Sequence, residues 1–258
     1  MYKIDLSSKK ALVFGVSNER SIGWHACKIL HEAGASIAIA YQSERFKDRV
    51  EKLAKDMKNV IFVQCDVSID EQIEQAFKTV QKEFGSLDYL IHSIAFAQRE
   101  DLGGDFSHLS RSGFQMALEI SAYSLIPLAR KAASLMGDNG GSITTMTFQA
   151  SERVFPGYNI MGTAKAALEN EVRQLAAEYG PKNIRVNAVS AGPLDTLSAR
   201  GIHGFLDMKK IHAEKSPLGR NITHQEVAKT VLYLCSDLSS GVTGAIIPVD
   251  AGYRVMAA

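Results

Sequence analysis

The sequence has little of what builds a metal site, a disulfide framework or a membrane anchor. Its 258 residues include only three cysteines, far apart in apolar surroundings, which favours buried free thiols in a reducing compartment. The seven histidines form no HxxH or HExxH pair and no CxxC occurs, so we expect no metal site. No apolar run approaches the roughly 18 residues that cross a membrane, and the amino-terminal MYKIDLSSKK lacks the apolar core of a signal peptide. We therefore expect a cytoplasmic protein with no membrane association.

An excess of charge of either sign is also missing. The 29 basic and 28 acidic residues give a formal net charge of +1 at pH 7, which leaves no basic field to hold nucleic acid or an anionic membrane. The hydrophobic content of 46% and charged content of 22% are typical of a soluble globular protein. No linker, repeat or low-complexity segment interrupts the chain, so we expect one domain over residues 1–258.

Segments with strand character alternate with segments of helical periodicity. Residues 10–15 are a short apolar run, a helical pattern follows until Gly34, and residues 35–40 are again apolar. This order is a βαβ unit. Further strands are expected at 60–67, 87–95, 141–147, 184–189 and 246–252. The alternation predicts an α/β fold, a Rossmann-type doubly wound parallel sheet of about seven strands with helices on both faces.

Several of the expected helices have recognisable ends. Ser68 and Glu71 have the spacing of a capping box for a helix that ends before Gly85, and Thr223 and Glu226 have the same spacing for a helix to Cys235. We also expect helices over 43–58 and 111–136, the latter with a possible break at Pro127. Residues 194–217 have weak helical patterning, and a segment of this length is typical of a lid or binding loop.

The turn after the first strand has features of a nucleotide site. Gly15 permits a tight turn, while Ser21 and the first helical N–H groups can receive a pyrophosphate. The loop is neither GxGxxG nor a P-loop, so alone it also fits an ordinary connection. Gln42 ends the second strand, where dinucleotide folds contact the adenosine ribose. Its neutral amide can hydrogen-bond the ribose hydroxyls, so we favour NADH over NADPH. Arg45 either meets a 2′-phosphate or belongs to a solvated helix face.

The ends of the third and fourth strands provide further candidates. Asp66 is placed either to bind an adenine amino group or to cap a turn or helix. Ile94 and Ala97 follow the fourth strand, where a ligand crevice is expected, so they are candidate pocket walls. His92, inside that strand, is better interpreted as a core histidine than as a catalyst.

One stretch, residues 148–168, combines a tyrosine and a lysine. Seven residues separate Tyr158 from Lys165, a spacing that returns to nearly the same face of an α-helix. A phenol beside an ammonium group is a proton-donating pair, because the cation favours phenolate. An amphipathic helix with an interfacial tyrosine and a surface lysine fits the same spacing.

Taken together, these motifs resemble the short-chain dehydrogenase/reductase superfamily, and most closely its divergent branch, the bacterial enoyl-acyl-carrier-protein reductases of type II fatty acid synthesis. The resemblance extends over nearly the whole chain, through GxxxxxSIG, CDV, HSIAFA, YNIMGTAK, RVNAVSAGP and VDAGY. Carbonyl-reducing members place the tyrosine four residues before the lysine, where this chain has Met161. The longer spacing is similar to that of members that reduce a conjugated thioester.

The resemblance implies roles for individual residues. Hydride from NADH adds to C3 of a trans-2-enoyl thioester, Tyr158 stabilises the enolate oxygen, and Lys165 holds the nicotinamide ribose. Ala97 then lies near the thioester carbonyl. The implied cofactor contacts are Gly15, Ser21, Ile22, Gln42, Asp66, Val67, Ile94, Lys165, Leu194 and Thr196.

The chain departs from the family at one site position. Ten residues before the catalytic tyrosine the family usually has a second tyrosine, and here Phe148 keeps the ring without the hydroxyl. The departure leaves open a reductase for another enone or carbonyl. A cofactor sensor without chemistry is a third hypothesis, although a sensor has no need of Tyr158 and Lys165. The family also implies a homotetramer and an acyl-carrier-protein substrate. Arg200, Lys209 and Lys210 either meet that acidic carrier or form a solvated face.

Overall fold

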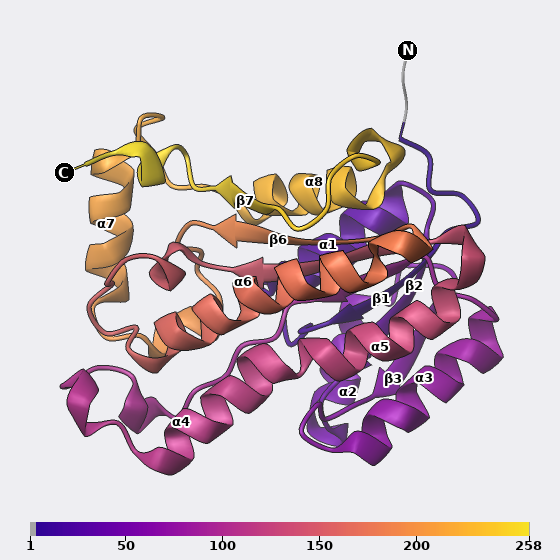
Figure 1. Cartoon of the computed structure of the whole chain (residues 1–258), viewed down its shortest axis with the longest axis horizontal. Helices are drawn as coiled ribbons and strands as arrows, with labels where there is room; N and C mark the ends of the chain where they lie inside the picture. Colours follow the sequence, from indigo (N-terminus) through magenta and orange to yellow (C-terminus); the bar gives the residue numbers. More distant parts are fainter. Residues whose placement is uncertain (1–3, 258) are drawn as a thin grey trace.

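The computed structural model describes residues 4–257, which form a seven-stranded parallel sheet between two layers of helices (Figure 1). The strand order is β3-β2-β1-β4-β5-β6-β7, and every neighbouring pair is parallel. The strands are β1 Lys10–Phe14, β2 Ser36–Tyr41, β3 Val60–Gln64, β4 Tyr89–His92, β5 Gly141–Thr147, β6 Ile184–Ala191 and β7 Ile246–Val249. The predicted doubly wound sheet is confirmed. Its order reverses between β1 and β4, which opens a crevice at their carboxyl ends.

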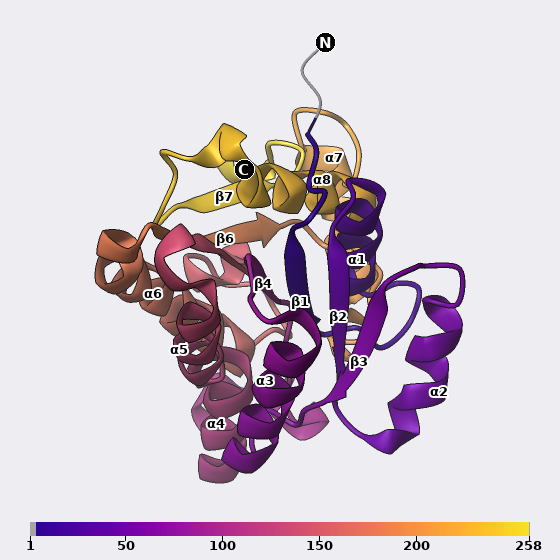
Figure 2. The same ribbon diagram turned by 90° about the vertical axis from the view of Figure 1, so that its right-hand side faces the viewer.

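The central strands β1, β2 and β4 are mostly apolar and buried because both faces of the sheet are covered. In β1, Leu12 and Phe14 point into one core while Ala11 and Val13 point into the other, as the two-residue period of a strand requires. Figure 2 shows the helices of the first core, α3 (Asp70–Phe84), α5 (Leu125–Met136) and α6 (Ile160–Tyr179), on one side of the sheet. The opposite side has α1 (Ile22–Glu32), α2 (Glu44–Leu53) and α8 (His224–Cys235).

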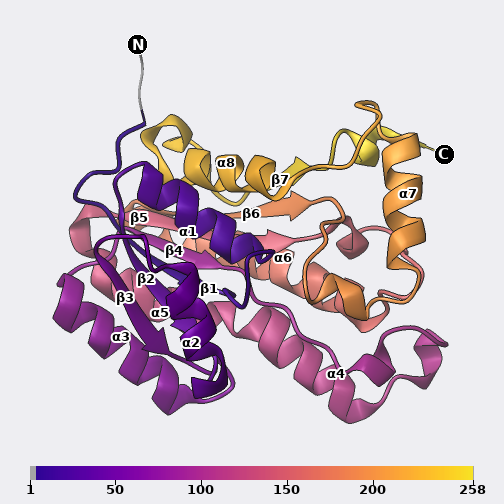
Figure 3. The ribbon, with the colours of Figure 1, turned by 180° about the vertical axis from the view of Figure 1, so that it is seen from behind.

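Two further helices lie at the carboxyl end of the sheet. They are α4 (Arg111–Leu118) and α7 (Phe205–Lys215), and Figure 3 shows α7 standing beyond the tip of the β6 arrow. Within residues 4–257, no helix combines the length and the apolar character needed to span a bilayer.

The structure corrects two expectations about helices. The segment 111–136 is interrupted by a π-helical turn, Glu119–Tyr123, and not at Pro127, which lies in the first turn of α5 where its missing N–H is tolerated. The capping box at Ser68 is also wrong. Ile69 precedes α3, and the Ser68 hydroxyl donates instead to Asp66 Oδ1 at 2.7 Å. The capping box of Thr223 and Glu226 at α8 is confirmed.

Candidate active site

A cavity of about 650 Å³ opens at the carboxyl ends of the strands. It is lined from the β1–α1 loop, from the ends of β2 to β6 and from α7. All thirteen residues singled out from the sequence line it: Gly15, Ser21, Ile22, Gln42, Asp66, Val67, Ile94, Ala97, Phe148, Tyr158, Lys165, Leu194 and Thr196. They come from segments far apart in the chain, so the topology of the sheet brings them together.

The hydroxyl of Ser21 holds the β1–α1 loop in shape through hydrogen bonds to the loop backbone. Ser21 Oγ accepts hydrogen bonds from the backbone N–H groups of Ser17 at 3.0 Å and Asn18 at 3.1 Å. Gly15 has a φ of +88°, and a Cβ there would lie 1.9 Å from the carbonyl oxygen of Ser93, the residue after β4, so only glycine fits. The loop therefore places the amino end of α1 at the cavity, and the backbone of the loop itself forms part of the cavity wall.

Beside this loop, Asp66 and Gln42 form a hydrogen-bonded pair. Gln42 Nε2 donates to Asp66 Oδ2 at 3.0 Å, and the backbone N–H of Ser68 donates to Asp66 Oδ1 at 3.0 Å. Burial alone would raise the pKa of Asp66, but the hydrogen bonds from Ser68 and Gln42 outweigh it and lower the pKa below its usual range. Asp66 thus caps a turn and not a helix, and its carboxylate stays ionised in the cavity.

Arg45 also lines the cavity on this side. Its guanidinium lies 4.9 Å from the centre of the Phe46 ring, and Phe46 is itself part of the wall. Arg45 is exposed and also lies at the cavity edge, so the structure fits both interpretations from the sequence.

The tyrosine and the lysine are placed differently from the helical-face prediction. Helix α6 begins at Ile160, so Lys165 lies on the helix but Tyr158 lies in the turn before it. Asn159 has a φ of +35°, and its side-chain amide donates to the carbonyl of Gly103 at 2.6 Å, which fixes this turn. The prediction of one shared helical face is therefore wrong. Both side chains nevertheless reach the same cavity, because the turn aims Tyr158 back toward it.

Lys165 is 4% exposed, which is unusual for a lysine. Its Nζ donates to the carbonyl of Met146 at 2.8 Å. Burial lowers the pKa of Lys165 to about 8, and the nearby carboxylate of Glu169 opposes the shift. Glu169 is in turn held by the Thr147 hydroxyl at 2.7 Å. The ammonium group is thus fixed by β5 and α6 together.

The Tyr158 ring packs edge-on against Phe148, with ring centres 5.1 Å apart. Burial raises the pKa of the Tyr158 phenol, the opposite of the direction that a nearby ammonium alone would give. The phenol is therefore neutral at physiological pH. It can donate a hydrogen bond or a proton into the cavity.

Sequence reasoning missed one residue that shapes this wall. Ser121, 0% exposed in the π-helical turn, accepts from the backbone N–H of Phe96 and donates to the Phe96 carbonyl, both at 2.9 Å. One hydroxyl thus holds both backbone groups of the residue beside Ala97. The two serines at 121 and 124, on the side of the segment 111–136 that is buried, were the available signal. His92 is confirmed as a core histidine, fully buried with Thr145 and Ser124 as partners.

The segment 194–217 contributes to the wall of the cavity. Leu197, Ile202, Phe205 and Met208 line it with apolar side chains, and Figure 3 shows α7 across this end of the sheet. Asp195 ties the segment to the β1–α1 loop, since its carboxylate lies 3.4 Å from Arg20. It also pairs with Arg200 of its own segment at 3.1 Å.

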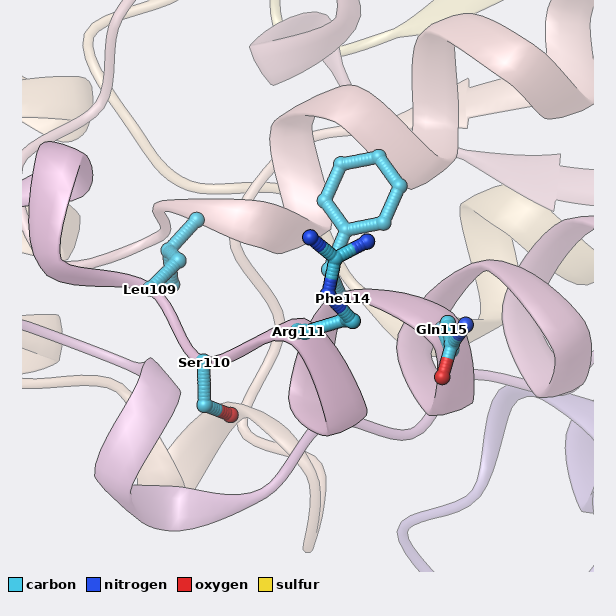
Figure 4. Close-up of a pocket in the computed structure, with 5 residues that line it drawn as sticks. All are labelled: Leu109, Ser110, Arg111, Phe114 and Gln115. Atoms are coloured by element: carbon cyan, nitrogen blue, oxygen red, sulfur yellow. The ribbon is translucent and has the colours of Figure 1, made fainter.

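A second hollow lies at the start of α4 (Figure 4). It is lined by Leu109, Ser110, Arg111, Phe114 and Gln115. The Ser110 hydroxyl is already engaged there as the cap of α4, accepting from the Gly113 N–H at 3.0 Å. None of the residues predicted for a site lies in this hollow, so we assign the chemistry to the large cavity.

A parallel sheet with a nucleotide loop, a tyrosine and a buried lysine around one switch-point cavity defines a nicotinamide-dependent oxidoreductase. The family model described as "Enoyl-(Acyl carrier protein) reductase" matches residues 15–254, and the chain belongs to this family.

Similar proteins extend over the whole chain. It is 46% identical to an enoyl-[acyl-carrier-protein] reductase [NADH] of Nostoc sp., with 98% of this chain and 99% of the relative covered. It is 45% identical to the [NADPH] enzyme of Staphylococcus aureus, with the same coverage. A crystal structure of the Bacillus cereus enoyl-acyl carrier protein reductase with NADP⁺ and indole naphthyridinone has a TM-score of 0.96 and 43% identity, and all of both chains is covered.

Proposed function

We propose that this protein reduces the trans-2 double bond of enoyl-acyl-carrier-protein thioesters with NADH, in type II fatty acid biosynthesis. The observation that carries the proposal is that Tyr158 and Lys165 open into the same cavity as the β1–α1 nucleotide loop. Family membership over residues 15–254 and the full-length similarity to NADH enzymes support it.

The cavity offers a place for each part of the nucleotide. The pyrophosphate fits the amino end of α1 beside Ser21, since helix N–H groups and the helix dipole favour an anion. The adenosine end fits between Gln42 and Asp66, with Val67 alongside. Ile94, Leu194 and Thr196 would hold the nicotinamide end, near Lys165. An ionised Asp66 beside the ribose position disfavours a 2′-phosphate, which supports NADH over NADPH.

Bound NADH supplies the hydride that adds to C3 of the substrate. Charge then develops on the thioester oxygen as an enolate, and the neutral phenol of Tyr158 donates a hydrogen bond to it. Lys165 holds the nicotinamide ribose, and its ammonium group adds positive field near the enolate. Ala97, next to the residue fixed by Ser121, would flank the thioester carbonyl.

Phe148 supports a second candidate function. Its ring lies against Tyr158 and leaves the wall beside the phenol without a second hydroxyl. A reductase for another enone or carbonyl therefore remains the alternative. The other site positions match the family, so we favour the enoyl thioester.

The partners follow from the same proposal. The acyl-carrier protein is acidic in this family, and Arg200 lies at the mouth of the cavity with Lys209 and Lys210 on α7 nearby. We infer a homotetramer in the cytoplasm. The resemblance to the family is what supports the homotetramer.

The test is the initial rate of NADH and NADPH oxidation with enoyl thioesters of several acyl lengths, with the Tyr158→Phe variant as control. We expect turnover with NADH that depends on Tyr158. Reduction of other enones but not of crotonyl thioesters would favour the second candidate. Tight NADH binding without turnover on any substrate would indicate a cofactor sensor.

A further inference from the structure

A column of five rings links the catalytic wall to helix α7. The ring centres of Tyr158 and Phe148 are 5.1 Å apart, those of Phe148 and Phe155 4.6 Å, and those of Phe155 and Tyr253 6.4 Å. Tyr253 then stacks on His212 of α7 at 4.6 Å, with the ring planes 24° apart. Tyr253 thus lies between the segment that leads to Tyr158 and the helix that lines the cavity.

The turn that carries Tyr253 is fastened to the same segment by polar contacts. Arg153 donates to the backbone carbonyls of Arg254 at 3.1 Å and Met256 at 3.3 Å. Arg254 pairs with Glu152 at 3.1 Å. The carboxylate of Asp250 closes the turn by accepting from two backbone N–H groups at 2.9 Å. Figure 1 shows this carboxy-terminal turn beside one end of α7.

His212 is buried between Tyr253 and the cavity wall. It is 2% exposed, and a Cβ on Gly192 would lie 2.9 Å from its Nε2, so the ring fills the space against a residue that lines the cavity. Nδ1 lies 3.3 Å from the Ser216 hydroxyl. Burial lowers the pKa of His212, and the carboxylate of Asp250 and the side chain of Asn221, which also interact with the ring, oppose this shift. Ring packing on Tyr253 is thus one of the contacts that hold this part of α7 in place.

We propose that Tyr253 is a positioning residue for the substrate, acting by holding α7 at a fixed distance from the segment that ends in Tyr158. Phe205 and Met208, on the same helix as His212, line the cavity, so the position of α7 sets the space for the acyl chain. The aromatic ring is the required group, because its two contacts are ring contacts to Phe155 and His212. The inference rests on the proposed enoyl-thioester substrate.

The experiment compares Tyr253→Ala with Tyr253→Phe in the full chain. The alanine variant is expected to raise KM for a long-chain enoyl thioester roughly tenfold, since an aromatic pair and its buried area are lost. KM for a crotonyl thioester and the NADH dissociation constant should stay within about twofold, because neither needs the far end of the cavity. Tyr253→Phe should behave as the wild type.

One control variant and one substrate-free readout separate positioning from general stability. Tyr179→Leu removes a buried ring from the far end of α6, where Lys182 lies 5.9 Å from the ring centre. This variant is expected to lower Tm without changing KM. Amide exchange over residues 205–215 should rise in Tyr253→Ala and not in Tyr179→Leu. This readout needs no substrate, so it tests Tyr253 even if the chain reduces no enoyl thioester.

Unchanged exchange over residues 205–215 together with an unchanged long-chain KM in Tyr253→Ala would overturn the proposal. An equal KM increase in Tyr179→Leu would overturn it as well, because a loss of overall stability would then explain both. An additive double variant with His212→Ala would show that the two rings do not act as a pair, and would also contradict it.

Discussion

The two halves of the cavity are held together in different ways. The nucleotide half combines contacts between residues close in the sequence, such as Ser21 with Ser17 and Asn18, with the longer-range pair of Gln42 and Asp66. The substrate half is fixed by contacts across long stretches of chain, such as Ser121 with Phe96 and Tyr253 with His212. We therefore expect substitutions in the nucleotide half to change cofactor affinity, and those in the substrate half to change KM and turnover for the thioester.

The largest expected effect is that of Tyr158→Phe, at the border between the halves. Loss of the phenol removes the donor to the enolate, so kcat should fall roughly 10²–10⁴-fold. NADH affinity should be nearly unchanged, because the ring packing on Phe148 is kept. Stopped-flow experiments measure the NADH affinity, and steady-state rates measure kcat. Equal loss of binding and turnover would contradict the assigned role.

Lys165 should behave in the opposite way to Tyr158. Lys165→Ala removes a charged donor from a buried position, and NADH binding is expected to weaken roughly 10–100-fold. An unaltered NADH dissociation constant would count against a ribose contact. Lys165→Arg, which keeps the charge, is the matched variant for separating charge from geometry.

The pH dependence gives an independent test of Lys165. Its pKa is lowered from 10.5 to about 8, so in the free enzyme the ammonium form is lost as pH rises through about 8, and kcat/KM should fall there. Stability should change in the other direction. Since the unfolded chain keeps its proton up to about 10.5, the free energy of unfolding should rise between about pH 8 and 10.5. Lys165→Met should lack both changes, and a wild-type kcat/KM that is flat through pH 8 would refute the assignment.

The same contrast explains what could be predicted from the sequence. The strands, the glycine turn and the residues at strand ends follow local patterns, and the fold came from these. Several of the thirteen lining positions, such as Val67, Leu194 and Thr196, came only from the family resemblance. The placement of Tyr158 did not follow a local pattern, because a positive φ at Asn159 starts the helix two residues later than the periodicity suggested. The π-helical turn and the pairing of Tyr253 with His212 depend on tertiary contacts that no local pattern encodes.

An effect of intermediate size is expected for Ser121→Ala, in the substrate half. The variant frees both backbone groups of Phe96, so KM for the thioester should rise about three- to tenfold while the NADH dissociation constant is unchanged. Ser142→Ala is the matched control, since it removes another fully buried hydroxyl, one that donates to the Leu234 carbonyl at 2.8 Å. Should both variants lose stability alike and neither change KM, Ser121 would be a structural residue only.

The smallest expected effect concerns Arg45, in the nucleotide half. A guanidinium at the cavity edge can attract a 2′-phosphate, whereas the ionised Asp66 opposes it. Because Arg45 is exposed, its contribution should be at most that of a surface ion pair, so Arg45→Ala should raise KM for NADPH about two- to fivefold and leave that for NADH unchanged. Arg49→Ala, one turn further along α2 and outside the cavity lining, controls for net charge. A larger loss for NADH than for NADPH would place Arg45 on the adenine instead, and the charge of Asp66 would then have to account for the cofactor preference alone.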